Sequence, residues 1–465
     1  MNSKFIRLNI ALLLALVFVS AVKADEVDKL VRAVMQERNV PGVGVAVVKN
    51  GRIVKKQGYG LANVELDVPV TADTVFEIGS VSKQMTAAAI MLLVEDGKIN
   101  LDEKISKYLS DTPDAWKNVS VRNLLTHTSG IKSYTAIGAG FELSKHLKRA
   151  EFIKLLASYP LDFETGSRYS YSNSGYNLLG FIIEAASGKS YWDFMRERIF
   201  QTLGMTATFD RDPKYIVKNR ATGYELENGL YIGRDYDLTD LFAAGAIIST
   251  VGDLAKWDAA WRNDTLLKKE SKAEAWKAFV LNDGKPNPYG FGWNVADFRA
   301  HRLISHSGST AGFNAQISRF IDDDLSVIVL TNLGDAGFAG TIARGIAKIY
   351  IPAISIRAMK PQSGADAELS QTFSNALRER MENKFSAQIL TDNLISSLST
   401  NRAKANNQRI NSFGAVKNFT LVSTETSENS KIYRYKAETA KRLFLWRFAV
   451  NAEGKISEMT LEDEE

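Results

Sequence analysis

Two groups of strand-like segments frame most of this chain, and their separation constrains the fold more than any other feature. Near the N-terminus, Gly42 to Val48 and Ile53 to Gly58 flank Lys49-Asn50-Gly51-Arg52. An Asn-Gly pair between two β-prone runs predicts a hairpin. Much later, Phe313 to Ile321 and Leu325 to Thr331 flank an acidic turn, and their apolar patterns fit strands of a covered sheet.

The segment between these two groups has a mainly helical pattern. From Leu101 to about Trp276, apolar residues recur at helical spacing between loops. Strands from both ends should therefore share one antiparallel sheet, with the helical region inserted between them. A closing helix is expected from Gly340 to Tyr350. We predict an α+β domain over residues 25–353, in which helices flank the sheet.

A second, smaller unit should follow, because 465 residues are long for a single domain. Residues 354–367 read as a linker, and residues 368–465 predict a small α+β module of unknown role. In the run Arg442 to Val450, aromatic residues alternate and should form a buried face. The predicted helices of this module are 368–384 and 386–399, and its strand-like runs are 416–425, 431–437, 442–450 and 455–461.

Residues 1–24 have the pattern of a secretory signal peptide. Lys4 and Arg7 precede the apolar run Leu8 to Val19, and Val22-Lys23-Ala24 fits cleavage after Ala24. An uncleaved N-terminal membrane anchor is the alternative interpretation, although the apolar run is short for a membrane span. We expect a periplasmic or secreted protein, with membrane attachment only if the signal remains.

Composition excludes several classes of function. The net charge of the chain is +5, and the first 24 residues contribute three of these charges, which leaves +2 for the remainder. A near-neutral chain without blocks of Lys and Arg gives no electrostatic case for nucleic acid. The chain has no cysteine, and its histidines lack metal-ligand spacing, so we predict neither disulfides nor a metal or other cofactor. The four histidines are His127, His146, His301 and His306.

Ser80 is the strongest candidate for a catalytic residue. It lies where a loop becomes an apolar helix, and Lys83 follows three residues later, on the same helical face. A helix N-terminus supplies free backbone N–H groups and a partial positive charge. A serine in this place can be deprotonated by its neighbour, and its own N–H can hold the oxyanion of an acyl intermediate.

Two further motifs follow Ser80 and Lys83 in the chain. Ser-x-x-Lys spacing alone is weak evidence, because it also occurs at Ser20 and Ser129. Tyr171-Ser172-Asn173 is the only place among sixteen tyrosines where asparagine follows two residues later, and His306-Ser307-Gly308 is the only His-x-Gly. The order of the three motifs suits acyl transfer in which lysine and tyrosine share the role of base.

Taken together, these motifs resemble those of the β-lactamase-related serine hydrolases, which include class C β-lactamases, D-Ala-D-Ala carboxypeptidases, D-amino acid peptidases and related esterases. The resemblance covers residues 30–350 and implies a β-lactamase/transpeptidase-like fold. The C-terminal module more weakly resembles cystatin-like or nuclear-transport-factor-like cone folds. The supporting stretches are Phe76-Glu77-Ile78-Gly79-Ser80, Leu124-Leu125-Thr126-His127-Thr128-Ser129-Gly130, Leu203-Gly204-Met205, Ala244-Gly245 with Ser249-Thr250, and Tyr289-Gly290-Phe291-Gly292-Trp293.

This resemblance implies a role for each site residue. Ser80 would be the nucleophile, with Lys83 as its neighbouring base or proton relay and Tyr171 as general base. The ammonium of Lys83 would lower the cost of forming a phenolate at Tyr171. Asn173 would bind the substrate amide or orient Lys83. The oxyanion would be held by the N–H groups of Ser80 and Ser309, the latter on an edge strand after His306-Ser307-Gly308.

One departure from the family pattern bears on the substrate. His306 stands where most β-lactamases have lysine, and a histidine that is mostly neutral at pH 7 attracts a substrate carboxylate less reliably. The resemblance therefore implies a peptidase or esterase rather than an efficient β-lactamase. We interpret His127 as a hydrogen-bonded structural residue.

Three functional hypotheses remain open from the sequence. The leading one is a hydrolase that cleaves amide or ester bonds in small molecules or peptides, such as D-amino acid peptides, small esters or β-lactams. The second is a penicillin-binding sensor that forms an acyl-enzyme but releases it too slowly to turn over. The third is a scaffold without catalysis. The oligomeric state is not fixed by any of them.

Overall fold

The computed structural model describes residues 25–137, 145–334, 337–364, 366–427 and 430–465. The predicted signal peptide lies outside these residues. The chain divides into two compact units, of which the first ends at Tyr350 and the second is Ile351–Glu465. Residues 354–367, predicted to form a linker, lie in the second unit. They begin at the last residue of a short 3₁₀ helix, η7 (Pro352–Ile354), and include a second one, η8 (Ile356–Ala358).

The first unit is built on a seven-stranded antiparallel sheet with the order β11-β12-β13-β14-β1-β2-β3. The prediction that strands from both ends of the domain share a sheet is confirmed, because β1 pairs with β14 and places Val47 opposite Val327. The expected hairpin is formed by β1 and β2. The strands are β1 (Gly42–Lys49), β2 (Arg52–Asn63), β3 (Val68–Pro69), β11 (Asn294–Phe298), β12 (His301–Thr310), β13 (Phe313–Phe320) and β14 (Leu325–Thr331).

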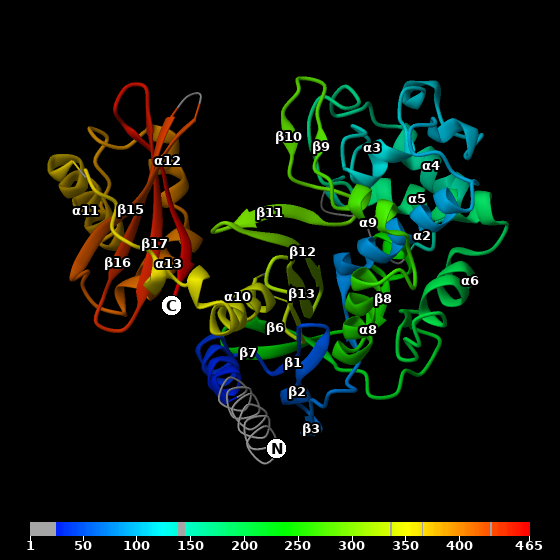
Figure 1. Ribbon diagram of the computed structural model, residues 1–465, viewed down its shortest axis with the longest axis horizontal. Helices are drawn as coiled ribbons and strands as arrows, with labels where there is room; N and C mark the ends of the chain where they lie inside the picture. The colour runs from blue at the N-terminus through cyan, green and yellow to red at the C-terminus, as the bar shows by residue number, and fades with distance from the viewer. Residues whose placement is uncertain (1–24, 138–144, 335–336, 365, 428–429) are drawn as a thin grey trace, which may run out of the picture. The chain divides into compact units, whose positions relative to one another are not determined.

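Helices pack against this sheet as predicted. Every residue of β14 is buried, and the strand contacts both α8 (Val251–Arg262) and α10 (Phe338–Tyr350), so both of its faces are covered. A helix over residues 25–38 packs beside α10, where the side chain of Leu30 approaches Gly345. Figure 1 shows α8 and α10 beside the strands of this sheet.

The inserted region is organised around α2 (Ser82–Glu95). Its residues from Ser82 to Leu93 are all buried, because other helices surround it. The helix ends before Gly97, whose φ of +72° suits a glycine just after a helix. The other helices are α3 (Val121–Leu125), α4 (Arg149–Ala157), α5 (Asn173–Ser187), α6 (Tyr191–Met195), α7 (Phe242–Gly245) and α9 (Lys269–Ala275).

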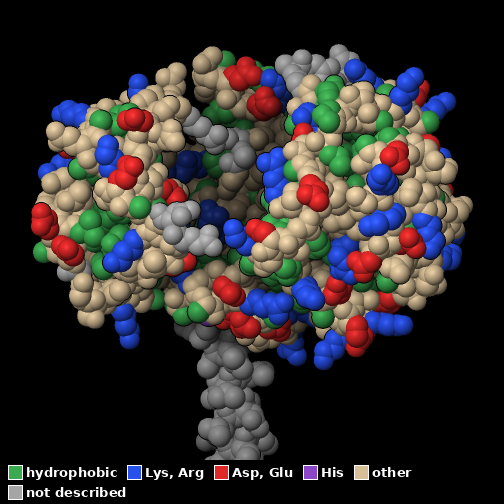
Figure 2. Space-filling model, turned by 90° about the horizontal axis from the view of Figure 1, so that it is seen from above, with side chains coloured by type: hydrophobic (Ala, Val, Ile, Leu, Met, Phe, Trp, Pro, Cys, Tyr) green, Lys and Arg blue, Asp and Glu red, His purple; other side chains and the backbone are tan. Residues whose placement is uncertain are grey.

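The same region contains short strands that the helical pattern did not indicate. One small sheet consists of β4 (Phe76–Glu77), β8 (Ile247–Ser249) and β5 (Phe209–Asp210). Its strand β4 comes just before Ser80 in the chain. A separate hairpin consists of β6 (Gly223–Glu227) and β7 (Leu230–Arg234). On the molecular face in Figure 2, Lys and Arg side chains are interspersed with Asp and Glu.

The second unit is the predicted α+β module. Its sheet has the order β15-β16-β17-β18, and its core includes Phe444, Trp446 and Phe448, so the predicted aromatic face is buried. The opposite face of the same strand is also covered, because Leu443 packs with Ile356. The elements are α11 (Ala367–Met381), α12 (Asp392–Leu398), α13 (Asn401–Asn411), β15 (Asn418–Ser427), β16 (Ser430–Glu438), β17 (Leu443–Asn451) and β18 (Ile456–Glu464).

We found no helix that combines the length and apolarity needed to cross a membrane in the parts of the chain that the structure describes.

Candidate active site

Ser80 and Lys83 occupy the junction between a 3₁₀ turn, η1 (Gly79–Val81), and α2. Gly79 has a φ of +50°, and this left-handed conformation turns the chain from β4 into the helix. Lys83 Nζ lies 3.0 Å from Ser80 Oγ. The predicted neighbour relation between the two side chains is therefore present, and it arises from one turn of helix.

The amine of Lys83 is held by three different segments. Besides Ser80 Oγ, Nζ lies 2.8 Å from Asn173 Oδ1 and 2.7 Å from the carbonyl oxygen of Ala244. The side chain is completely buried, and this burial lowers its pKa well below the ordinary value for lysine. A buried amine with one hydroxyl and two carbonyl-type partners can be neutral, with its lone pair directed at the hydroxyl.

Tyr171 lies on the other side of Ser80. Its hydroxyl hydrogen-bonds to Ser80, and Lys83 Nζ lies 4.8 Å from the centre of its ring. The side chain is 36% exposed and borders the cleft. Burial of the hydroxyl raises the pKa of Tyr171 above its ordinary value, and the contact with Ser80 only partly opposes this. Burial disfavours charge on both groups in the resting site, so the effect of a Lys83 ammonium on phenolate formation stays a prediction.

Asn173 orients Lys83. It is the first residue of α5, and Ser172 caps that helix by accepting the N–H of Gly175. The Oδ1 atom of Asn173 faces Lys83, while its Nδ2 donates to Thr135 Oγ1 at 3.0 Å. The sequence left two roles open for Asn173, binding of the substrate amide and orientation of Lys83. These contacts favour orientation of Lys83.

His306 is a neutral histidine in this site. Its Nδ1 lies 2.6 Å from the carbonyl oxygen of Ser307, which can only accept, so Nδ1 carries the proton. Its Nε2 then accepts from the hydroxyl of Tyr289 at 2.8 Å. Burial is the main cause that lowers the pKa of His306 to about 3, and any positive charge on Lys83 acts in the same direction. The histidine therefore brings no positive charge to the cleft near pH 7.

Gly308 and Ser309 bring the sheet against Ser80. A Cβ atom on Gly308 would lie 1.9 Å from the carbonyl oxygen of Ile78 and 3.0 Å from the backbone nitrogen of Ser80, so only glycine fits. A Cβ atom on Gly79 would lie 2.8 Å from the nitrogen of Ser309. The backbone amides of Ser80 and Ser309 thus belong to one contact between η1 and β12.

The edge-strand prediction for Ser309 is wrong, because β11 lies outside β12 in the sheet. The pairing between these strands ends, however, where Ser305 faces Asn294. Beyond that point none of the described residues forms a strand on the outer side of β12, so residues 306–310 form a local edge, part of which lines the cleft. The sequence could not show this, because it depends on the length of β11.

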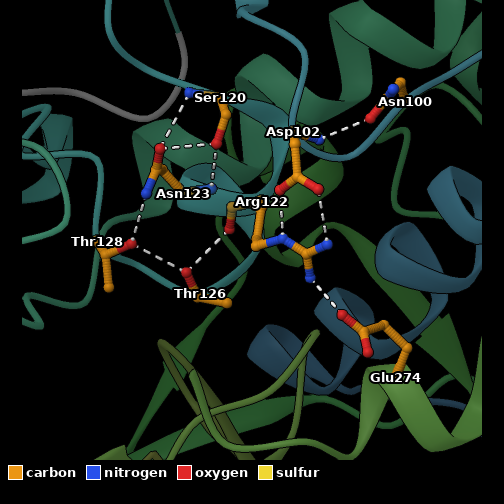
Figure 3. A network of polar contacts seen from close by, with 8 residues as sticks. All are labelled: Asn100, Asp102, Ser120, Arg122, Asn123, Thr126, Thr128 and Glu274. Carbon is orange, nitrogen blue, oxygen red and sulfur yellow. Dashed lines mark hydrogen bonds and ion pairs between the residues drawn. The ribbon is translucent and has the colours of Figure 1, made fainter. Parts of the chain in front are cut away.

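His127 lies directly behind Tyr171, with ring centres 4.3 Å apart. Its Nδ1 accepts the backbone N–H of Ser172 at 3.1 Å, which fits the prediction of a hydrogen-bonded structural histidine. The residue has a φ of +56° in the turn after α3. Polar contacts hold both ends of this turn: Thr126 and Thr128 bond to each other at 3.0 Å, as Figure 3 shows.

The same network extends to the neighbouring loops. The amide of Asn123 donates to Thr128 at 3.1 Å, and Arg122 forms ion pairs with Asp102 and Glu274 (Figure 3). These contacts fix the turn that carries His127, and through Ser172 they fix the start of α5. The positions of Tyr171 and Asn173 therefore depend on residues outside the cleft.

These groups open into one cleft of about 630 Å³. It contains Ser80, Tyr171, His306, Gly308 and Ser309, so the structure brings most of the predicted site together, with Lys83 and Asn173 behind Ser80. Several other residues line the cleft, and no sequence motif indicates a catalytic role for them. They are Tyr169, Tyr289, Asn294, Ser307, Asn314, Gln316, Gly337, Gly340 and Arg344. Within the described residues, no group of three or more His, Asp or Glu side chains could hold a metal ion.

Comparison with known proteins agrees with this geometry. The family described as Beta-lactamase matches residues 27–350. Penicillin-binding protein 4* of Bacillus subtilis is 32% identical over 62% of this chain and 67% of its own length. D-aminopeptidase of Brucella anthropi is 31% identical over 66% of this chain and 58% of its own length. The chain thus spans about two thirds or less of these relatives.

Solved structures show the same fold. D-amino acid amidase from Ochrobactrum anthropi SV3, complexed with L-phenylalanine amide, has a TM-score of 0.60 and 26% identity, covering 71% of this chain and 98% of its own. The octameric penicillin-binding protein homologue from Pyrococcus abyssi has a TM-score of 0.62 and 23% identity, covering 92% and 96%. The family match and the arrangement around Ser80 lead to one conclusion: this chain belongs to the β-lactamase family of serine hydrolases.

Proposed function

We propose that this protein is a secreted or periplasmic hydrolase that cleaves small amides and esters through an acyl-enzyme at Ser80. The environment of Lys83 carries the proposal. Its amine is completely buried, lies 3.0 Å from Ser80 Oγ, and is held by an amide oxygen and a carbonyl. Such an amine is available as a base near neutral pH, because burial lowers its pKa.

The first step is acylation. Lys83 takes the hydroxyl proton of Ser80, and Oγ attacks the substrate carbonyl to form a tetrahedral intermediate. The N–H groups of Ser80 and Ser309 hold the resulting oxyanion, since both belong to the contact between η1 and β12. Each such donor typically contributes a factor of about 10²–10³ in rate.

Departure of the leaving group needs a proton, and Tyr171 can supply it. Because burial raises its pKa, the phenol is protonated at neutral pH and can donate to the leaving nitrogen or oxygen. The ammonium of Lys83 then returns its proton to the phenolate. In deacylation, water attacks the ester carbonyl, the water proton passes to the Lys83–Tyr171 pair, and Ser80 Oγ leaves as the hydroxyl.

Two observations, the names of the relatives and the lining of the cleft, support a proposal for the substrate class. D-aminopeptidase and D-amino acid amidase, by their names, act on D-amino acid derivatives, and we propose such amides or short peptides as substrates here. Tyr169, Tyr171 and Tyr289 give the cleft an aromatic wall that suits an apolar acyl side chain. Neutral His306 argues against efficient capture of β-lactams through a cation at that position.

Intact-protein mass spectrometry would test the proposal. Wild type and Ser80→Ala would each be mixed with D-phenylalanine amide, an activated ester or a penicillin, and followed over time together with product release. We expect turnover of the amide or ester in wild type only, with a transient adduct. The absence of both turnover and adduct with all three compounds would refute the proposal.

The two alternatives give different outcomes in the same experiment. An adduct that persists without product would identify the penicillin-binding sensor. A scaffold would give no adduct, and its role would survive Ser80→Ala. The bonds between Lys83, Asn173 and Ala244 favour the hydrolase, since a scaffold has no need for a buried lysine in this environment.

A further inference from the structure

The second unit contains a cavity that takes no part in the chemistry proposed above. Its volume is about 280 Å³, and it lies where α11, α13 and β17 meet. All of its lining residues belong to the unit Ile351–Glu465. Ligand sites in proteins typically measure about 300–1,000 Å³, so this cavity has the size for a small molecule.

The inner wall of the cavity is apolar. Leu377 comes from α11 and Ile410 from α13, while Phe444 and Trp446 come from β17. All four belong to the hydrophobic core of the unit. Protein cores ordinarily contain few voids larger than a water molecule, so the core is left incomplete at this point. An apolar molecule that filled the gap would remove its own surface and that of the wall from water.

Trp446 adds a hydrogen-bond donor that the protein does not use. Its side chain is 1% exposed, and its indole N–H has no hydrogen-bond partner among the described residues, although a buried indole usually has one. The indole nitrogens of Trp261, Trp276 and Trp293 also lack partners, but they are completely buried in a cluster of packed rings. That of Trp446 is not completely buried, and its ring lines the cavity. The N–H is therefore available to an acceptor atom of a bound molecule.

The ring of Trp446 is held in place by a residue outside the cavity lining. The guanidinium of Arg380 lies 4.9 Å from the centre of the ring. Arg380 is fixed in turn, because it donates to Asn407 at 3.1 Å and to the carbonyl oxygen of Met459. The wall formed by Trp446 therefore exists before a ligand binds, which lowers the entropic cost of binding.

The charged groups at the edge of the cavity favour an anion. Arg378 is exposed and forms neither a hydrogen bond nor an ion pair with a described residue. Glu382 lies one helical turn later and is paired with Lys384 at 2.8 Å, while Arg378 acts on it only through its charge. These three side chains leave one net positive charge at this edge. A guanidinium without a partner can bind a carboxylate through two parallel hydrogen bonds.

We propose that this cavity binds a small carboxylic acid with an apolar body. The hydrocarbon part would lie against Phe444 and Trp446, and the carboxylate would face Arg378. Aromatic walls of this kind suit a ring or a branched chain. The inference is independent of the proposed function, because it assigns the second unit a binding role of its own.

A matched series of three compounds would test the cavity by calorimetry on the chain with both units. 3-Phenylpropionate has the ring and the carboxylate, 3-phenylpropan-1-ol lacks the charge, and acetate lacks the ring. Trp446 is the only tryptophan after residue 350, so an emission change that is lost in Trp446→Phe places the compound beside it.

Four further variants separate the contributions. Ser374→Phe fills the cavity from α11, and Ser374→Ala is its control at the same position. Arg378→Gln removes the charge, and its control Lys404→Gln alters an exposed lysine of α13 that does not line the cavity. Urea unfolding shows whether Ser374→Phe is folded. If it is not, Ala415→Leu fills the cavity from the loop after α13.

We expect 3-phenylpropionate to bind with a Kd of about 0.1–5 mM, as suits a ligand of its size, and acetate not to saturate. The alcohol should bind about two- to fivefold more weakly than the acid, because Arg378 is exposed, and salt should reduce this difference. Ser374→Phe should weaken binding by about tenfold or more, since its ring takes the same space. Arg378→Gln should abolish the preference for the acid, and both controls should match wild type.

Three results would overturn the inference. The first is no saturable binding of 3-phenylpropionate up to about 20 mM. The second is binding that survives both cavity-filling variants, because such binding would lie elsewhere, for example in the cleft of Ser80. The third is equal binding of acid and alcohol, unchanged by Arg378→Gln, which would remove the carboxylate from the proposal. Because the readout is binding, these results do not depend on whether Ser80 is catalytic.

Discussion

Glu77, three residues before Ser80, should make the stability of the hydrolase domain depend on pH. The carboxyl group is buried, with 3% of its surface exposed. It accepts a hydrogen bond from Thr310 at 2.7 Å, and Arg211 Nε lies 3.7 Å away. Burial raises the pKa of Glu77 from 4.5 to about 7, against the opposing effects of Thr310 and Arg211. The folded protein should therefore keep this proton up to neutral pH.

The size and sign of the effect follow from these two values. Below pH 4.5 the carboxyl is protonated in both the folded and the unfolded chain. Between pH 4.5 and 7 the folded chain binds more protons, so the free energy of unfolding falls as pH rises. The full loss above pH 7 is about 3 kcal/mol, taking ~1.36 kcal/mol per pKa unit. Glu77→Gln removes this titration and should gain that amount relative to wild type between pH 4.5 and pH 8.

Urea unfolding followed by tryptophan fluorescence would measure this difference, because six of the seven tryptophans precede residue 351. The matched control is Glu103→Gln, whose carboxyl has its pKa lowered by a hydrogen bond from Lys107. Its contribution has the opposite sign and is lost as pH falls below 4.5. A constant difference between Glu77→Gln and wild type across this range would refute the reasoning. If Glu77→Gln instead became less stable than wild type as pH rises, Arg211 would be holding the Glu77 carboxylate in its charged form.

Other substitutions test the site and the second unit directly. Gly308→Ala places a Cβ atom against the contact that aligns the oxyanion donors, and kcat should fall by ~10²–10³ in an ester assay, with binding less affected. Lys83→Met removes the base at similar volume, and single-turnover acylation should slow by ~10²–10⁴. His127→Phe leaves the N–H of Ser172 without its acceptor and should cost about 1–3 kcal/mol in urea unfolding. Trp446→Ala should destabilise the second unit by about 3–5 kcal/mol, with little change in acylation by an activated ester.

The sequence could predict elements that leave a local signal. The β1–β2 hairpin was readable from Asn50-Gly51, and α2 from its apolar run. The hairpin of β6 and β7 carries the same signal at Asn228-Gly229, both with positive φ, so the Asn-Gly rule also predicts this hairpin within the region whose overall pattern is helical. Helix α13 has a weak sequence signal, because its residues are mostly polar and lack a clear apolar stripe.

Some residues of the site can likewise be predicted from the sequence, and others only from the tertiary structure. Ser80 and Lys83 are close in sequence, so helix geometry alone relates them. Tyr289 contacts His306, and the carbonyl of Ala244 accepts from Lys83. Both are tertiary contacts, which the spacing of residues along the chain does not predict. Nor could the sequence show that His306 is neutral, since that follows from burial and from two hydrogen-bond partners. Arg344 belongs to a helix whose place beside the cleft appears only in three dimensions.

The pairing of β1 with β14 also delays completion of the sheet during synthesis of the chain. Val47 lies opposite Val327, so roughly 280 further residues must emerge before β1 gains this neighbour. At about 5–20 residues per second, synthesis of that stretch takes roughly 14–56 s. Through this interval an apolar strand, Gly-Val-Gly-Val-Ala-Val-Val-Lys, keeps one edge open to pairing with other chains. We expect a chain with this topology to benefit from a chaperone that binds the unpaired strand, and its yield to fall when translation slows before residue 325.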